Sequence, residues 1–184
     1  IELGYGKLME RLLMFKELRD KNLKISNISL DNSSLYSLII PQAEQELKNF
    51  KSTIPAPVAI LGDASSSMNV AIRTATIISS LLAAICSAKL TFFNQANFES
   101  KLDPKDVKDV LQVAYDTKAS GSTAPAASLV PYFDNKTIIK TFIIVTDEEE
   151  NTDGKTLDGR SWRFYPLFME YRKTVYPASL IFIS

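Results

Sequence analysis

The sequence predicts an α/β protein with a Rossmann-like, mostly parallel central sheet that is covered by helices on both faces. Two observations predict this fold class. Apolar runs typical of buried strands recur along the chain, and helical patterns stand between them. Strands joined by crossover helices run parallel, and such a sheet is buried on both faces. The length of 184 residues suits one such domain with an addition at one end.

Residues 1–53 form the predicted addition, a helical extension that packs on the domain or links it to a neighbour. Residues 4–21 carry leucine and phenylalanine at helical spacing with charged residues between them, which predicts an amphipathic helix. Residues 22–37 are polar and broken and predict a loop. A short helix is predicted over residues 42–51, with Pro41 at its first turn, where proline is tolerated.

The predicted α/β domain spans residues 54–184 and begins with a strand over residues 58–62. Residues 69–87 predict a helix that is apolar on nearly every side and is therefore central and covered. The remaining elements follow from alternating strand and helix patterns. In chain order they are a strand at 88–94, a short antiparallel edge strand at 98–100, a helix from Asp103 to Thr117, a helix at 124–133, a strand at 138–146, a flexible surface loop at 151–161, a helix at 162–174 and a last strand at 180–183.

Charge and residue usage narrow the classes of function. Lys plus Arg equals Asp plus Glu at 21 each, so no global charge indicates a nucleic acid or an anionic membrane as partner. The sequence has no histidine, which removes Ser-His-Asp and Cys-His catalysis and most zinc sites. The single cysteine, Cys86, lies in an apolar stretch and is predicted to be a small buried side chain. We expect an intracellular, cytoplasmic protein that does not cross a membrane.

Polar side chains follow the first predicted strand directly. Asp63, Ser65 and Ser67 alternate, so in an extended or gently turning loop their side chains can reach one point. Functional loops lie at the carboxyl ends of parallel strands. The loop Ser120 to Thr123 and the residue Asp147, which ends a later apolar strand, can complete a site there. Hard oxygen ligands of this kind suit Mg²⁺ or Mn²⁺.

These three segments, in this order, resemble the metal-ion-dependent adhesion site of von Willebrand factor A (vWA) domains. The resemblance covers about residues 55–184 and implies the vWA fold. Members of that family usually carry a further strand and a closing helix, so we expect either a domain that is truncated after its fifth strand or one in which the N-terminal helix covers the gap. The family's site maps, with no departure, onto Asp63, Ser65, Ser67, Thr123 and Asp147.

The resemblance also implies a role for each of these residues. Ser65 and Ser67 bind the ion directly, and Thr123 binds it directly or through water. Asp63 and Asp147 act mainly through water, which leaves excess positive charge on the ion. A Glu or Asp of a protein partner then fills the vacant coordination position.

A second resemblance lies near the carboxyl end of the chain. The segment from Glu170 to Ile181 is weakly similar to Ro-type RNA-binding autoantigens. In that family an A domain is joined to a helical-repeat ring that holds RNA. The resemblance implies an RNA-containing assembly in which other parts of the parent protein contact the RNA, because no such ring is visible in this sequence.

Three functions stay open at this stage. The favoured one is a metal-dependent binding or scaffold module, and the second is part of a Ro-like ribonucleoprotein. The third is a metal-dependent, phosphatase-like enzyme, because Asp63 resembles the nucleophile of haloacid-dehalogenase phosphatases. Those enzymes have a second Asp where this chain has Ser65, so we expect no enzyme. A structural alternative also stays open, in which Asp63, Ser65 and Thr123 only cap helices and Asp147 caps a helix or is simply exposed.

Overall fold

The computed structural model describes residues 4–26 and 35–184 and has the Rossmann-like, mostly parallel α/β architecture that the sequence predicts. The sheet has the strand order β3-β2-β1-β4-β7, and only β3 runs antiparallel to its neighbour. β1 lies at the centre because it pairs with β2 on one side and β4 on the other. The strands are β1 (Val58–Asp63), β2 (Lys89–Phe93), β3 (Asn97–Glu99), β4 (Thr141–Val145) and β7 (Ser179–Ile183).

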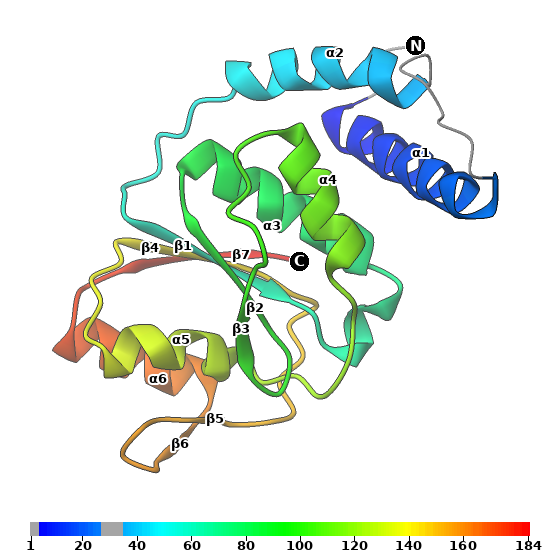
Figure 1. Cartoon of the computed structure of the whole chain (residues 1–184). Helices are drawn as coiled ribbons and strands as arrows, with labels where there is room; N and C mark the ends of the chain where they lie inside the picture. The colour runs from blue at the N-terminus through cyan, green and yellow to red at the C-terminus, as the bar shows by residue number, and fades with distance from the viewer. Residues whose placement is uncertain (1–3, 27–34) are drawn as a thin grey trace.

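Helices cover both faces of this sheet (Figure 1). Helices α3 (Ile72–Cys86) and α4 (Val107–Asp116) lie on one face, and α5 (Pro125–Asp134) and α6 (Phe164–Thr174) lie on the other. Side chains alternate along a strand, so β1 contributes side chains to the hydrophobic cores on both faces of the sheet. Ile60 packs into the core with α3, whereas Leu61 packs into the core with α5 and α6.

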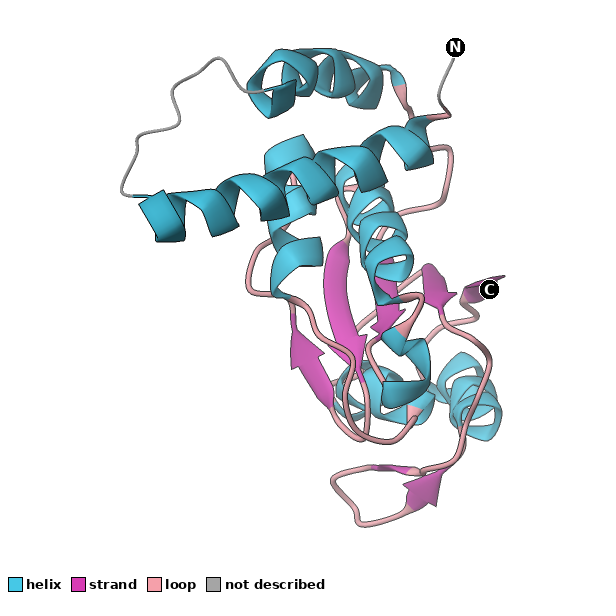
Figure 2. Cartoon of the chain, turned by 90° about the vertical axis from the view of Figure 1, so that its right-hand side faces the viewer, coloured by secondary structure: helices cyan, strands magenta, loops and turns pink. Residues whose placement is uncertain are grey.

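Two further helices, α1 (Tyr5–Ser26) and α2 (Leu35–Asn49), form an outer layer over α3 and α4 (Figures 1 and 2). Their apolar side chains share one buried cluster with Ile77 of α3 and Leu111 of α4. Polar contacts join the layers as well, since Thr74 donates a hydrogen bond to Glu10 at 2.9 Å. Within residues 4–26 and 35–184, no helix combines the length and the apolar character that crossing a bilayer requires.

The prediction of a loop over residues 22–37 is wrong for the part of this segment that the structure describes. Helix α1 continues to Ser26 and α2 begins at Leu35, while residues 27–34 lie outside the described residues. Pro41 lies inside α2 rather than at its first turn. Proline inside a helix costs about 3 kcal/mol. Burial of Ile40 and Leu47, at about 1.5–3 kcal/mol each, offsets that cost.

Two predicted helix starts are also wrong. The segment after β1 first forms a 3₁₀ helix, η1 (Ser66–Asn69), and α3 begins only at Ile72. Helix α4 begins at Val107 rather than at Asp103. Its N-cap is Asp106, whose carboxylate accepts a hydrogen bond from the Asp109 backbone N–H at 2.8 Å. The later aspartate satisfies a free N–H of the first turn, which explains the shift.

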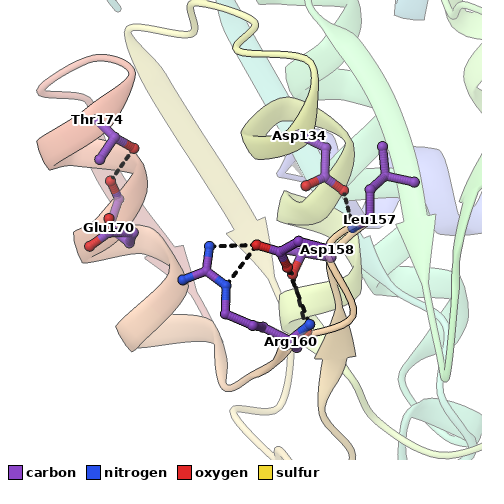
Figure 3. A network of polar contacts seen from close by, with 7 residues as sticks. Asp134, Leu157, Asp158, Arg160, Glu170 and Thr174 are labelled. Atoms are coloured by element: carbon purple, nitrogen blue, oxygen red, sulfur yellow. Dashed lines mark hydrogen bonds and ion pairs between the residues drawn. The ribbon is translucent and has the colours of Figure 1, made fainter.

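The segment predicted as a flexible surface loop, residues 151–161, contains two short paired strands, β5 (Gly154–Lys155) and β6 (Ser161–Trp162). Figure 3 shows how the tip of this hairpin is held. The Leu157 N–H donates to Asp134 of α5 at 3.0 Å, and Arg160 donates to Asp158 at 2.7 Å. The same view shows Glu170 and Thr174 on α6, away from the hairpin. These side-chain hydrogen bonds hold residues 151–161 in place. The turn residues of this segment, taken alone, predicted a flexible loop.

Cys86 lies at the end of α3 and is half-buried rather than fully buried. Its thiol donates a hydrogen bond to the Ser52 hydroxyl over 3.3 Å. The side chain therefore lies at the margin of the core and not within it.

Candidate metal centre

The candidate site begins with a buried carboxylate at the carboxyl end of β1. Asp63 is the last residue of that strand, and its side chain is 0% exposed. Gly62 of β1 pairs with Val145 of the neighbouring strand β4, which brings Thr146 beside Asp63. The Thr146 hydroxyl donates a hydrogen bond of 2.6 Å to Asp63 Oδ2. The parallel pairing of β1 and β4 therefore places one hydroxyl donor on this carboxylate.

The residues after β1 extend the site from the protein interior to the surface. The Ser65 backbone N–H donates to Asp63 Oδ1 at 2.8 Å. The Ser65 hydroxyl lies 3.0 Å from the Ser67 hydroxyl. Ser65 is buried whereas Ser67 is exposed. The structure thus brings the three predicted residues together as a line of oxygen atoms that ends in solvent.

The helix-capping alternative is wrong for Ser65 and Thr123. Ser65 is the N-cap residue of η1, but its side chain makes no capping hydrogen bond. The N-cap of α3 is Ala71 and that of α5 is Ala124, and neither helix takes a side-chain cap. Asp63 accepts the N–H of the N-cap residue Ser65 itself and not an N–H from within η1. The polar side chains at this edge therefore remain available for another task.

The loop that carries Thr123 lies against the loop after β1. The Ser66 N–H donates to the Gly121 carbonyl at 3.0 Å. Gly121 has φ +79°, a backbone conformation that strains any residue with a side chain, so this position favours glycine. Thr123 is 1% exposed, and its backbone N–H donates to Asn151 Oδ1 at 2.9 Å. The predicted second segment is thus held beside Ser65 and Ser67.

Asp147 follows Thr146 at the end of β4 and is exposed. The pKa of Asp63 lies above its usual value, chiefly because burial disfavours the charged carboxylate. Hydrogen bonds from Ser65 and Thr146 oppose this rise, and the negative charge of Asp147 adds to it. The two carboxylates are therefore near enough to repel each other. A cation at this edge would relieve that repulsion.

The oxygen atoms at this edge suit a hard divalent cation that is bound by few charged side chains. Among the described residues, no three acidic, histidine or cysteine side chains gather to hold a metal. A metal at this edge would therefore have two carboxylates at most, with hydroxyls and water as its other ligands. Mg²⁺ keeps several waters and binds through one or two carboxylates, so it suits such a set. Asp63 already accepts two hydrogen bonds, which suits a role through water.

Sequence reasoning missed two residues that support the site. Thr146 holds the Asp63 carboxylate, and Asn151 holds the backbone of Thr123. Thr146 and Asp63 are 83 positions apart, and no spacing rule relates them. The available signal is the position of Thr146, a polar residue that ends a buried parallel strand next to the first one. A prediction that β4 pairs with β1 would have placed Thr146 beside Asp63.

Comparisons with known proteins find similarity among solved structures and none among family models or curated proteins. The crystal structure of the Ro (RSR) protein of Deinococcus radiodurans is similar to this chain, with a TM-score of 0.45 and 12% sequence identity. The match covers 98% of this chain and 46% of that one, so this chain spans about half of the Ro protein's length.

Fold and site together define a class of protein. The chain is a Rossmann-like α/β protein that carries a buried carboxylate and a line of hydroxyls at the carboxyl edge of its sheet. The resemblance to vWA domains stays a prediction from the sequence, as do the division of the chain at residue 54 and the ligand role of the site residues.

Proposed function

We propose that this chain is a metal-dependent binding module. Its site would present Mg²⁺ or Mn²⁺ to a Glu or Asp of a protein partner, within a larger intracellular assembly. One observation carries the proposal: the oxygen atoms of Asp63, Ser65 and Ser67 follow one another from the buried end of β1 to the surface. A line of hard ligands that ends in solvent allows an incoming carboxylate to reach the same point.

Each residue has a distinct task in this proposal. Ser65 and Ser67 would supply hydroxyl ligands, and Thr123 would approach from the facing loop. Asp63 and Asp147 would balance the charge from a greater distance, with Thr146 holding Asp63 in place. The bound ion would supply a concentrated positive charge. A partner carboxylate gains a charge-assisted contact there, which favours acidic partners over neutral ones.

Calorimetric titration with Mn²⁺ and Mg²⁺ tests the proposal. We compare the unmodified chain with the double variant Ser65→Ala/Ser67→Ala and with Ser66→Ala as a matched control, because Ser66 lies between the two substituted residues and is exposed. The double variant is expected to bind at least roughly tenfold more weakly, and Ser66→Ala is expected to bind normally. Equal heats for all three proteins would show that the loop is structural only.

We further propose that the chain is not an enzyme. A phosphatase of the type considered above would use Asp63 as nucleophile, and Asp63 is 0% exposed and already accepts two hydrogen bonds. Assay of a generic phosphomonoester with Mg²⁺ is expected to show no turnover. Turnover that is abolished by Asp63→Asn would overturn this part of the proposal.

The second candidate is membership of an RNA-binding ribonucleoprotein of the Ro type. The segment near the carboxyl end of the sequence favours it, and so does a basic surface at the opposite edge of the sheet. Tyr171 accepts a hydrogen bond from the Ile139 N–H and donates one to the Thr137 carbonyl, which holds the 135–140 loop against α6. Four exposed cations lie on these two segments, and none makes an ion pair within the described residues: Lys136, Lys140, Arg172 and Lys173.

Electrophoretic mobility of small structured RNAs distinguishes the two candidates. Phosphate contacts make binding depend on salt and on each cation that is removed. If this surface contributes to an RNA-containing assembly, Lys140→Ala/Arg172→Ala lowers the affinity of the chain for RNA, whereas Lys101→Ala/Lys105→Ala leaves it unchanged. If the chain does not shift any RNA at low salt, contact with RNA falls to other parts of the parent protein.

A further inference from the structure

A cavity of about 410 Å³ opens beside the candidate metal centre. It lies where β4 and β7 end and α6 begins. Its lining includes Thr146, whose hydroxyl holds Asp63, so the cavity and the metal site share a wall. The side chains that matter most here are of two kinds, aromatic and acidic: Phe164, Tyr165, Phe182, Glu148, Glu149 and Glu150.

The aromatic part of the lining is open to solvent. Tyr165 is 66% exposed and Phe182 is 50% exposed. Phe164 is buried, and its ring meets that of Phe182 edge to face at 6.0 Å between centroids. Large aromatic side chains that stay exposed beside a cavity mark an interaction surface. Their rings offer apolar area and a negative face to an incoming group.

The acidic part of the lining lacks cations of its own. The Glu150 carboxylate is engaged, since it accepts the Phe164 N–H at 2.7 Å. Glu148 and Glu149 are exposed, and neither pairs with a cation within the described residues. The nearby cation is Arg163, which is held by Asp153 at 2.8 Å and by the Glu150 carbonyl at 2.6 Å. The negative charge at the mouth of the cavity is therefore unmatched.

A ring surface next to free carboxylates suits a flat cation. A guanidinium stacks on aromatic rings and donates to carboxylates in the same plane, and it is more weakly hydrated than an ammonium. The chain already uses this combination on its hairpin. Arg160 lies over the Trp162 ring at 5.0 Å while it pairs with Asp158 at 2.7 Å.

We propose that this cavity receives an arginine side chain of the protein partner whose carboxylate would bind at the metal centre. The inference rests on the proposed function and deepens it, because it names the chemistry of the partner. Thr146 lines the cavity and contacts the site, so one partner segment can occupy both places. The preferred partner then carries an acidic residue and an arginine close to each other, and a purely acidic segment is repelled by Glu148 and Glu149.

Nuclear magnetic resonance titration with a capped arginine tests this inference without metal. Nα-acetyl-arginine methylamide is added to the unmodified chain in the presence of a chelator, and the Phe182 and Tyr165 ring signals are followed. The norleucine and lysine analogues are titrated in parallel. We expect saturable shifts with arginine that are roughly tenfold weaker in Glu148→Gln/Glu149→Gln. The double variant Asp103→Asn/Glu170→Gln removes the same charge elsewhere and should bind as the unmodified chain does.

Each other outcome overturns the inference. Equal binding of norleucine would make the cavity a plain apolar groove, and equal binding of lysine would remove the preference for arginine. Shifts that persist unchanged in Glu148→Gln/Glu149→Gln, or no shifts at all, would exclude a cation site. Because a chelator is present, failure here leaves the Mn²⁺ titration of the Ser65→Ala/Ser67→Ala variant as a separate test. The two proposals can therefore fail independently.

Discussion

At the residue scale, the Thr146 hydroxyl stabilises the one fully buried carboxylate of the candidate site. It donates to Asp63 Oδ2 at 2.6 Å and also accepts the Glu148 N–H at 3.1 Å. A hydrogen bond to a charged group contributes about 1.5–3 kcal/mol, roughly twice the contribution of a neutral one. The stability of the buried Asp63 carboxylate thus depends on Thr146, a residue that would not itself bind the metal.

Thr146→Val should lower the free energy of unfolding by about 1.5–3 kcal/mol, because it leaves a buried carboxylate with one donor fewer. Thr141→Val is the matched control. Thr141 is about as buried and begins β4, the strand that Thr146 directly follows, but it donates to the neutral Pro55 carbonyl over 3.2 Å. Its loss should cost about 0.5–1.5 kcal/mol. Urea denaturation at neutral pH measures both, and equal losses would mean that Asp63 does not depend on Thr146.

One half-buried and one buried tyrosine, Tyr5 and Tyr132, predict the behaviour of the protein in alkali. Burial raises the pKa of Tyr5 to about 12 and that of Tyr132 to about 12, above the ordinary value of 10.0. The unfolded chain then loses these protons first. The stability that they contribute is complete below about pH 10 and is lost as pH rises toward about 12.

Substituting each tyrosine by phenylalanine separates burial from hydrogen bonding. The Tyr5 hydroxyl donates to the Ala43 carbonyl at 2.9 Å, whereas the Tyr132 hydroxyl has no partner within the described residues and lies near, but not bonded to, Thr91. Tyr5→Phe should cost about 0.5–1.5 kcal/mol at pH 7, and Tyr132→Phe should cost little. Both variants should lose less stability above pH 10. Urea denaturation between pH 7 and 11 measures this, and an unchanged alkaline slope would contradict the cause given.

The residues nearest to the first strand were the ones that the sequence could place. Asp63, Ser65 and Ser67 lie within five positions, so local geometry alone brings them together. Thr146 reaches Asp63 through the pairing of two strands, and Asn151 reaches Thr123 through the contact of two loops, so only the folded chain reveals them. Which of these residues bind a metal stays a prediction.

At the scale of elements, the start of α4 shows how a local rule selects between two candidates. Asp103 precedes a proline and predicts a helix start, yet Asp106 makes the cap. Asp106→Ala should therefore cost about 0.5–2 kcal/mol, because a free N–H of the first turn loses its acceptor. Asp103→Ala should change little. Thermal unfolding of the two variants measures the difference, and the reverse order would contradict the observed cap.

Helices α1 and α2 complete the core on one side of the sheet. Leu12 is 0% exposed in the cluster that these helices share with α3 and α4, whereas Leu18 of the same helix is 50% exposed. Leu12→Ala should cost about 2–5 kcal/mol through the cavity that it leaves, and Leu18→Ala should cost far less. Chemical denaturation of both variants measures this. A small effect of Leu12→Ala would mean that the outer layer is only loosely attached.

Helical and strand periodicity predicted the type and order of most elements, because burial imposes those periods. The errors arose where packing or side-chain bonds outweighed a local signal. Pro41 lies inside α2 because Ile40 and Leu47 are buried around it. The β5–β6 hairpin is ordered by the bond from Leu157 to Asp134, which lies on another element.

At the scale of the whole molecule, the two edges of the sheet differ in chemistry. The carboxyl edge carries Asp63, Asp147 and the glutamates that follow, and the amino edge carries the four cations near Tyr171. Fold class and strand direction could be predicted because strands and helices alternate. The charge separation could not, because it arises only when distant loops meet. It gives the two candidate functions separate surfaces on one chain.

The most direct test of the central claim is an anomalous diffraction map from crystals grown with MnCl₂. We predict a single strong manganese peak at the carboxyl edge, in contact with the Ser65 and Ser67 hydroxyls and close to Asp63. A peak only at Glu148 and Glu149, or none at this edge while manganese binds elsewhere, would contradict the claim that these loops form a metal centre.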